Sequence, residues 1–269
     1  DMGKFIDEAF ENRWIDVFPR EGKGGGAFCS ELAGIDQSRI LTNFAGSFSD
    51  VSTLAHELGH AWHNHCMMGL PLSMTDAPMP LAETASIFNE TLLANAAMAQ
   101  ADKKEKLSLL EGNLMETTQT IVDILSRYLF ETEVIERRKD HTLSVGELKE
   151  IMLDAQEQSY GNGLDPQLRH PYMWACKSHY YISGLAFYNF PYAFGQLFGA
   201  GVFAQYQEKG ADFVPKYNQL LRSCGSGMIA DVAASVGIDV RSVDFWRSSL
   251  RVYEKEIDEF IALADELLG

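Results

Sequence analysis

Apolar residues recur every three or four positions along most of the chain, which is the spacing of a helix with one buried face. The pattern predicts helices over residues 2–17, 51–67, 81–100, 103–140, 144–160, 195–208, 211–222, 228–236 and 242–268. Gly112 marks a break in the longest of them, and Ser144 with Glu147 predicts a capping box at the start of another. Asp50 and Ser52 are the candidate N-caps of the 51–67 helix. The chain is therefore expected to be mainly α.

Two short runs have the composition of β-strands instead. Residues 27–29 and 39–44 are separated by a turn that contains Gly34, so they predict one hairpin. Glycines between 22 and 26 end the first helix, and prolines mark a loop over 69–80. No linker rich in serine or proline divides the 269 residues. We therefore expect one domain over 1–269, mainly α, with one small sheet.

The net charge and the cysteine content limit which partners the protein is expected to bind and in which compartment it is expected to occur. The formal net charge of −16 argues against nucleic acid and against anionic membrane surfaces as partners. The chain contains no run of 18 or more apolar residues, so no transmembrane helix is predicted. The four cysteines show no close pairing, so we expect reduced thiols in a cytoplasmic protein. The chain starts at Asp1 inside a helical pattern, without an initiator Met or a signal peptide, and we expect it to be a C-terminal fragment of a longer polypeptide.

The 51–67 helix contains His56-Glu57-Leu58-Gly59-His60, the His-Glu-x-x-His arrangement. Residues four positions apart lie on the same face of a helix, so His56 and His60 can direct two imidazoles at one metal ion. Glu57 lies one step round the helix, within reach of a water on that metal. This arrangement is typical of zinc hydrolases, in which the metal acidifies a water and the Glu takes its proton. The alternative is a core helix with histidines on its surface.

A catalytic zinc usually has a third protein ligand, and several residues could supply it. The longer metzincin pattern would require Gly and His at the positions that His63 and Cys66 occupy. His63 lies roughly 10 Å along the helix from His56, at 1.5 Å per residue, which favours a packing role for it. His65 is expected to be solvated. Three acids follow before residue 100, namely Asp76, Glu83 and Glu90.

Glu83 is the strongest candidate among these acids. It lies 23 residues after His60 (83 − 60), which allows a loop and an antiparallel return, whereas Asp76 lies in the proline-bounded loop. The alternative role for Glu83 is to complement the dipole at the start of a helix. Glu90 lies two turns further on the same face, where it could accept a hydrogen bond from a ligand histidine or form a salt bridge.

The chain resembles the thimet oligopeptidase and oligoendopeptidase F family of zinc metallopeptidases. Glu83-Thr-Ala-Ser after the His-Glu-x-x-His motif is similar to the family pattern, and Gly26-Ala-Phe-Cys with Ile40-Leu-Thr-Asn resembles its lead-in to that motif. Phe130-Glu-Thr-Glu-Val resembles a helix in the middle of the family domain. His179-Tyr-Tyr, with the aromatic stretch 187–195, resembles its C-terminal signature. The similarity runs from about Gly22 to the C-terminus.

The resemblance implies a helical zincin-type catalytic domain with a small sheet beside the metal-binding helix. It implies an oligoendopeptidase that hydrolyses internal bonds of short peptides in a deep channel. One zinc per chain is held by His56, His60 and Glu83, and Glu57 serves as the general base for a zinc-bound water. Family members are longer, with an N-terminal helical lobe that this chain lacks.

The aromatic stretch is expected to stabilise the oxyanion that forms during peptide hydrolysis. His179 would act with Tyr188 or Tyr192, and the choice stays open because the family often has Tyr where this chain has Phe190. Tyr181 is a third candidate and is expected to contact the substrate. Core packing is the alternative role for each of these rings.

Asn43 is also expected to contact substrate, since the strand over 40–43 could pair with an extended peptide. Two other functions remain open. One is a zinc exopeptidase, a carboxypeptidase or aminopeptidase that acts on chain ends. The other is a non-catalytic helical domain stabilised by metal, against which the intact Glu57 argues, because a structural site needs no base.

Overall fold

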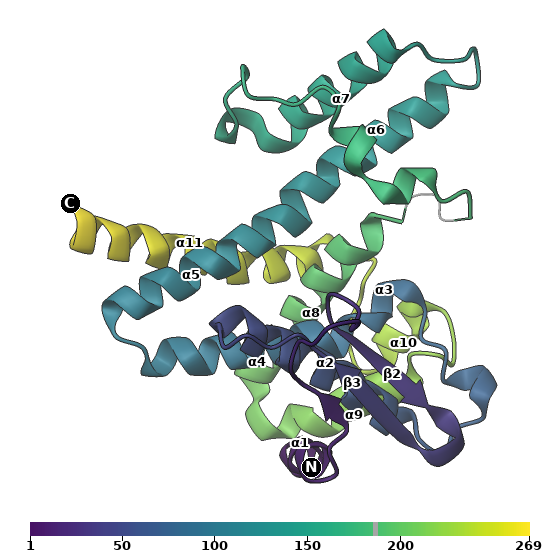
Figure 1. The fold of residues 1–269 in the computed structure, drawn as a ribbon, viewed down its shortest axis with the longest axis vertical. Helices are drawn as coiled ribbons and strands as arrows, with labels where there is room; N and C mark the ends of the chain where they lie inside the picture. The colour runs from purple at the N-terminus through teal and green to yellow at the C-terminus, as the bar shows by residue number, and fades with distance from the viewer. Residues whose placement is uncertain (185–187) are drawn as a thin grey trace. The chain divides into compact units, whose positions relative to one another are not determined.

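The computed structural model describes residues 1–184 and 188–269, and Phe187 of the aromatic stretch lies outside the described residues. Contacts divide the chain into two compact units, which we call unit 1 (1–111 with 197–269) and unit 2 (112–196). The boundaries fall inside helices α5 (Lys103–Thr118) and α8 (Phe190–Lys209) (Figure 1). Because helical sequence runs across both boundaries, no linker composition marks them.

Unit 1 contains a sheet of three strands in the order β1-β3-β2, formed by β1 (Ile15–Asp16), β2 (Phe28–Leu32) and β3 (Gln37–Leu41). Strands β2 and β3 are antiparallel and lie side by side, which confirms the predicted hairpin (Figure 1). β1 is parallel to β3 and falls where we expected the first helix to continue. Helix α1 (Met2–Glu11) ends earlier because Arg13 has a positive φ of 56°, which a helix does not allow.

The central position of β3 makes one expectation wrong. Ile40 donates its backbone NH to the carbonyl of Trp14 on one side and is registered with Cys29 of β2 on the other. The 40–41 backbone therefore has no free edge to offer an extended peptide. Strand β2 forms an outer edge of this sheet.

Helix α2 (Phe48–Met67) carries the His-Glu-x-x-His motif and packs on β2, β3 and helix α4 (Thr84–Gln100) (Figure 1). It begins earlier than predicted, because Ser47 is the N-cap and forms a capping box with Asp50. Gly59 permits a close approach to α4: a Cβ there would lie 2.5 Å from the carbonyl oxygen of Ala85. The motif helix is therefore held against the first turn of α4.

The predicted helix over 81–100 is interrupted at Glu83, which separates α3 (Met79–Ala82) from α4. Glu83 has φ −86° and ψ 2°, so its side chain leaves the backbone at a bend between two helices. Phe88 of α4 stacks on Tyr217 of α9 (Val214–Ser223) with ring centroids 4.3 Å apart, and this contact fixes α4 within the core. Helices α10 (Ile229–Ser235) and α11 (Val243–Leu268) complete unit 1.

Unit 2 is built around α6 (Ile124–Arg137) and α7 (Val145–Tyr160). Its core contains Phe130, Ile151, Met152 and Ala155. The capping box at Ser144 is confirmed. The break predicted at Gly112 is wrong: α5 continues through that residue, and a π-helical turn over Gln119–Asp123 interrupts the run instead. Short 3₁₀ turns over Met173–Cys176 and Ser178–Tyr181 lead towards α8.

Within the described residues, no helix combines the length and the apolar character needed to cross a membrane.

Candidate active site

Three potential metal ligands converge in unit 1. The Nε2 atoms of His56 and His60, one turn apart on α2, are 3.1 Å from each other. Each of these nitrogens is 3.3 Å from Oε2 of Glu83, which reaches them from the bend before α4. Among the residues that the structure describes, this is the cluster of histidine, cysteine and acidic side chains with the geometry to hold a metal ion. Asp76, in contrast, is exposed in its loop and is not part of the cluster.

The spacing of the three atoms fits a tetrahedral ion. Ligand atoms about 2.1 Å from a tetrahedral zinc lie about 3.4 Å from one another, because the tetrahedral angle sets their separation. The observed separations of 3.1 to 3.3 Å are close to this value. Two imidazole nitrogens and one carboxylate oxygen are also a donor set that zinc accepts.

Helix α4 orients these side chains through further hydrogen bonds. Oε1 of Glu90 lies 2.6 Å from Nδ1 of His56, so the proton on Nδ1 leaves the lone pair of Nε2 facing the cluster. The hydroxyl of Ser86 donates to Oε2 of Glu83 at 2.7 Å. Asn89 donates to the carbonyl of Ala55 at 3.4 Å and ties the two helices together. The carboxylates of Glu83 and Glu90 thus reach the same histidine from one helical region.

The cluster has a strong electrostatic preference for positive charge. Burial alone would lower the pKa of His56, but the hydrogen bonds that its ring donates to Glu83 and Glu90 outweigh burial and raise that pKa to about 10. Burial would raise the pKa of Glu83, and the two histidines outweigh it and hold that pKa far below its usual range. A group of two carboxylates around two imidazoles therefore favours a bound cation.

Glu57 lies beside the cluster without being part of it. The residue is 5% exposed, and its Oε2 atom has no hydrogen-bond partner among the described residues. Burial raises the pKa of Glu57, although the neighbouring His56 and His60 act in the opposite direction. A buried carboxylate oxygen without a partner is costly for folding. A buried carboxylate of this kind next to three candidate metal ligands is typical of a group that accepts and donates protons during a reaction.

The two other histidines of α2 have different surroundings. His63 is buried, and its Nε2 lies 3.2 Å from the carbonyl oxygen of Leu221, to which it donates. Burial lowers the pKa of His63 to about 4, so the ring is neutral in the folded protein near neutral pH. His65 is partly buried and stacks on Trp62 with centroids 5.1 Å apart, so the expectation of a fully solvated ring is wrong.

The buried His63 predicts a loss of stability in acid. Its pKa falls from 6.5 to about 4 on folding, so its contribution is complete above pH 6.5 and is lost as the pH falls towards 4. At 1.36 kcal/mol per pKa unit this loss is about 3 kcal/mol. His63→Gln keeps a donor near the Leu221 carbonyl and removes the titration. Urea unfolding of metal-free protein at pH 7 and pH 4 should show a smaller decrease for this variant, and an equal decrease would contradict the assignment.

The cluster opens into a pocket of about 410 Å³. The lining includes His56, Glu57, His60 and Glu83 together with β2 residues that sequence reasoning missed, which are Phe28, Cys29 and Glu31. Burial raises the pKa of the Cys29 thiol to about 12, so this thiol is an inert wall of the pocket. The packing of β2 against the motif helix, which brings these residues to the pocket, is a contact between segments that are distant in the sequence.

Asn43 lines a neighbouring pocket and not the one that contains the cluster. Its Nδ2 group donates to the carbonyls of Gly24 and Gly26, each at 2.9 Å. Asn43 therefore fastens the glycine-rich segment before β2.

The remaining predicted site residues lie in unit 2. The ring centroid of His179 is 4.7 Å from that of Tyr188 and 6.0 Å from that of Tyr192. The two tyrosine rings are 5.6 Å apart in an edge-to-face arrangement. Tyr181 is separate from this trio: it is 62% exposed, and its hydroxyl lies 3.5 Å from the carbonyl of Trp174. The structure thus brings together three of the four rings.

Comparison with known proteins places this architecture among peptidases. Oligoendopeptidase F (chromosomal) of Lactococcus lactis subsp. cremoris is 29% identical to the chain over 266 residues, which is 97% of this chain and 43% of the relative. The chain therefore spans less than half the length of this relative. A solved structure from Chlamydophila abortus has a TM-score of 0.85 and 24% identity, over 97% of this chain and 44% of that one. Metallocarboxypeptidase 1 of Trypanosoma cruzi has a TM-score of 0.64 and 14% identity, over 94% and 60%.

The two structural similarities establish a shared fold, which confirms the expectation of a mainly α architecture with a small sheet. The model of peptidase family M3 matches residues 2–252, nearly the whole chain and both of its units. The family resemblance expected from the motifs is thereby confirmed: the chain belongs to peptidase family M3.

Proposed function

We propose that residues 1–269 form the catalytic domain of a zinc-dependent oligoendopeptidase that hydrolyses internal bonds of short peptides. The observation that carries this proposal is the convergence of His56, His60 and Glu83 beside Glu57, whose Oε2 atom has no hydrogen-bond partner among the described residues. Membership of peptidase family M3 supports peptides as the substrate class. The name of the Lactococcus relative supports cleavage at internal bonds.

In the proposed mechanism His56, His60 and Glu83 hold one zinc ion. Bound zinc lowers the pKa of water and polarises a carbonyl group. Glu57 accepts the proton of the attacking water and later delivers it to the amine that leaves. Glu90 keeps His56 in the tautomer that directs Nε2 into the cluster. Glu57 is buried, and among the described residues no hydrogen bond competes for its Oε2 atom.

The carbonyl oxygen of the scissile bond becomes negatively charged during the attack and needs hydrogen-bond donors. We assign this role to His179 with Tyr188 or Tyr192, whose rings form one group in unit 2. Tyr181, exposed and outside that group, would contact the substrate further from the reacting bond.

A carboxypeptidase is the second candidate, because metallocarboxypeptidase 1 of Trypanosoma cruzi shares the fold. The fold alone does not distinguish the two activities. A peptide acetylated at its N-terminus and amidated at its C-terminus does so, because an exopeptidase needs a free end. With zinc bound, the protein should cleave this peptide internally, and a chelator should abolish cleavage. Cleavage of the unblocked peptide alone would establish an exopeptidase, and a zinc-loaded protein that cleaves neither would be a non-catalytic domain.

We place the protein in the cytoplasm, with short peptides as its partners. None of the four cysteines forms a disulfide in the structure, which fits a reducing compartment. The net charge of −16 disfavours nucleic acid and anionic membrane surfaces.

A further inference from the structure

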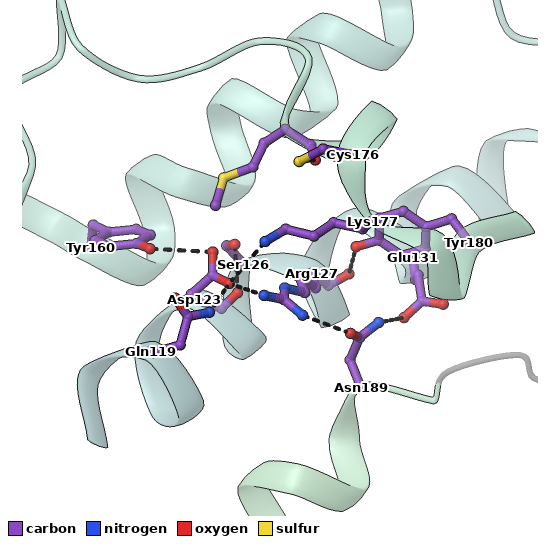
Figure 2. A network of polar contacts seen from close by, with 11 residues as sticks. Gln119, Asp123, Ser126, Arg127, Glu131, Tyr160, Cys176, Lys177, Tyr180 and Asn189 are labelled. Atoms are coloured by element: carbon purple, nitrogen blue, oxygen red, sulfur yellow. Dashed lines mark hydrogen bonds and ion pairs between the residues drawn. The ribbon is translucent and has the colours of Figure 1, made fainter. Parts of the chain in front are cut away.

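Unit 2 contains a buried polar network centred on Asp123, at the end of the π-helical turn (Figure 2). Asp123 is 1% exposed, and four side chains reach its carboxylate. Gln119 donates to it at 2.7 Å and Tyr160 at 3.3 Å, Arg127 forms an ion pair with it, and Nζ of Lys177 lies 3.8 Å away. The π turn thus presents one carboxylate to groups from α6, α7 and the segment before α8.

Arg127 extends this network towards the aromatic segment. Its Nη1 donates to the side-chain oxygen of Asn189 at 3.2 Å, while its Nη2 pairs with Asp123 (Figure 2). The fully buried Asn189 in turn donates to Glu131 at 3.2 Å. The hydroxyl of Tyr180 donates to the backbone carbonyl of Arg127 at 3.3 Å. One arginine therefore contacts two separate points of the chain after α7.

These contact points flank the rings assigned to the oxyanion. Lys177 and Tyr180 lie on either side of His179 in sequence, and Asn189 directly follows Tyr188. The rings of His179 and Tyr188 are 4.7 Å apart. Contacts of residues 177, 180 and 189 with Asp123 of the π turn and Arg127 of α6 therefore fix the backbone from which both rings extend.

Stability alone does not account for the network. It buries ion pairs, whose desolvation cost often equals or exceeds their mutual attraction, so apolar side chains of similar volume would serve a core as well. A planar guanidinium can make directed hydrogen bonds to two partners at once, which an apolar side chain cannot do. The arrangement therefore suits a role in positioning.

We propose that Arg127, supported by Asp123 and Asn189, is a positioning residue that holds His179 and Tyr188 in the arrangement needed to stabilise the oxyanion. The inference rests on the proposed function. It predicts that loss of Arg127 lowers kcat without changing the binding of zinc or of peptide, because the ground state does not depend on the oxyanion donors.

The test compares Arg127→Met with Arg137→Met, the same substitution on the same helix at a half-exposed residue whose side chain forms an ion pair with Glu133. For Arg127→Met we expect kcat for a blocked peptide to fall about 10-fold or more, with KM and zinc content within about two-fold of wild type. Amide hydrogen exchange over residues 188–192, next to the lost contact with Asn189, should accelerate, while α7 keeps its protection. Arg137→Met should match wild type in all four measurements.

Asn189→Leu provides a second variant that leaves the pair of Arg127 and Asp123 intact, so folding of α6 is not at risk. It should also lower kcat and accelerate exchange over 188–192, because it removes the side-chain contacts of Asn189 with Arg127 and Glu131. If wild type cleaves the peptide and both variants keep full kcat or unchanged exchange, this inference is overturned and the proposed function stands. If wild-type protein with zinc cleaves no peptide, the proposed function itself is overturned.

Discussion

Glu57→Gln should abolish nearly all peptide hydrolysis, with a fall in turnover of about 1,000-fold or more while zinc content stays at the wild-type level. The substitution keeps the volume of the side chain in a site that is 5% exposed, so packing is preserved. It removes the one carboxylate beside the cluster whose oxygen has no other partner. An amide cannot accept the proton of the attacking water, and it cannot return one to the leaving amine.

Glu31→Gln is the matched control for this experiment. Glu31 lines the same pocket from β2, and burial raises its pKa as it does that of Glu57. Its substitution makes the same chemical change in the same pocket but leaves the motif helix untouched, so turnover should stay within a few-fold of wild type. A Glu57→Gln protein that keeps a tenth of the wild-type turnover would exclude Glu57 as the base.

The second large effect concerns the third zinc ligand. Glu83→Ala should weaken zinc binding by about 100-fold or more. Even the loss of a residue that only orients a metal ligand lowers metal affinity by about 10–100-fold, and Glu83 is itself a proposed ligand. Oε2 of Glu83 lies 3.3 Å from Nε2 of both histidines, so its loss leaves two ligands and an incomplete tetrahedron. Activity should be lost together with the metal.

Asp76→Ala is the control, since Asp76 was the rival carboxylate in the sequence and lies exposed in the loop before α3. Its zinc dissociation constant should stay within about two-fold of wild type, because the residue is outside the cluster. Competition with a chromophoric zinc chelator measures both variants on one scale. Tighter zinc binding by Glu83→Ala than by Asp76→Ala would transfer the third ligand to the loop.

Local sequence was sufficient to locate the centre of this site. The separation of His56 and His60 by four residues places both rings on one helical face whatever surrounds the helix, and the structure has their Nε2 atoms 3.1 Å apart. The capping box of Ser144 and Glu147 fixed a helix start for the same reason, since its hydrogen bonds connect residues three apart. The β2–β3 hairpin is also a local structure, joined by a short turn.

Other features depend on partners that are distant in the chain. Strand β1 is only two residues long and is formed by pairing with β3. Its own sequence favoured a helix, because Trp14 and Val17 have helical spacing. The bend at Glu83 and the contact of Glu90 with His56 follow from the packing of α4 against Gly59. The bend cannot be derived from periodicity, whereas a hydrogen bond from a ligand histidine to Glu90 was one of the two roles that helical spacing allowed for that residue.

The polar network of unit 2 depends most clearly on tertiary packing. Arg127 and Asn189 are 62 residues apart, the first in a helical pattern and the second in the aromatic stretch, and nothing in the sequence connects them. Burial brings the two side chains together, because a polar group removed from water needs a hydrogen-bond partner inside the protein. The sequence by itself therefore determined the local geometry of the metal-binding motif. The bend at Glu83 and the partners of Arg127 were determined by packing between distant segments, because only that packing sets which polar groups lose contact with water.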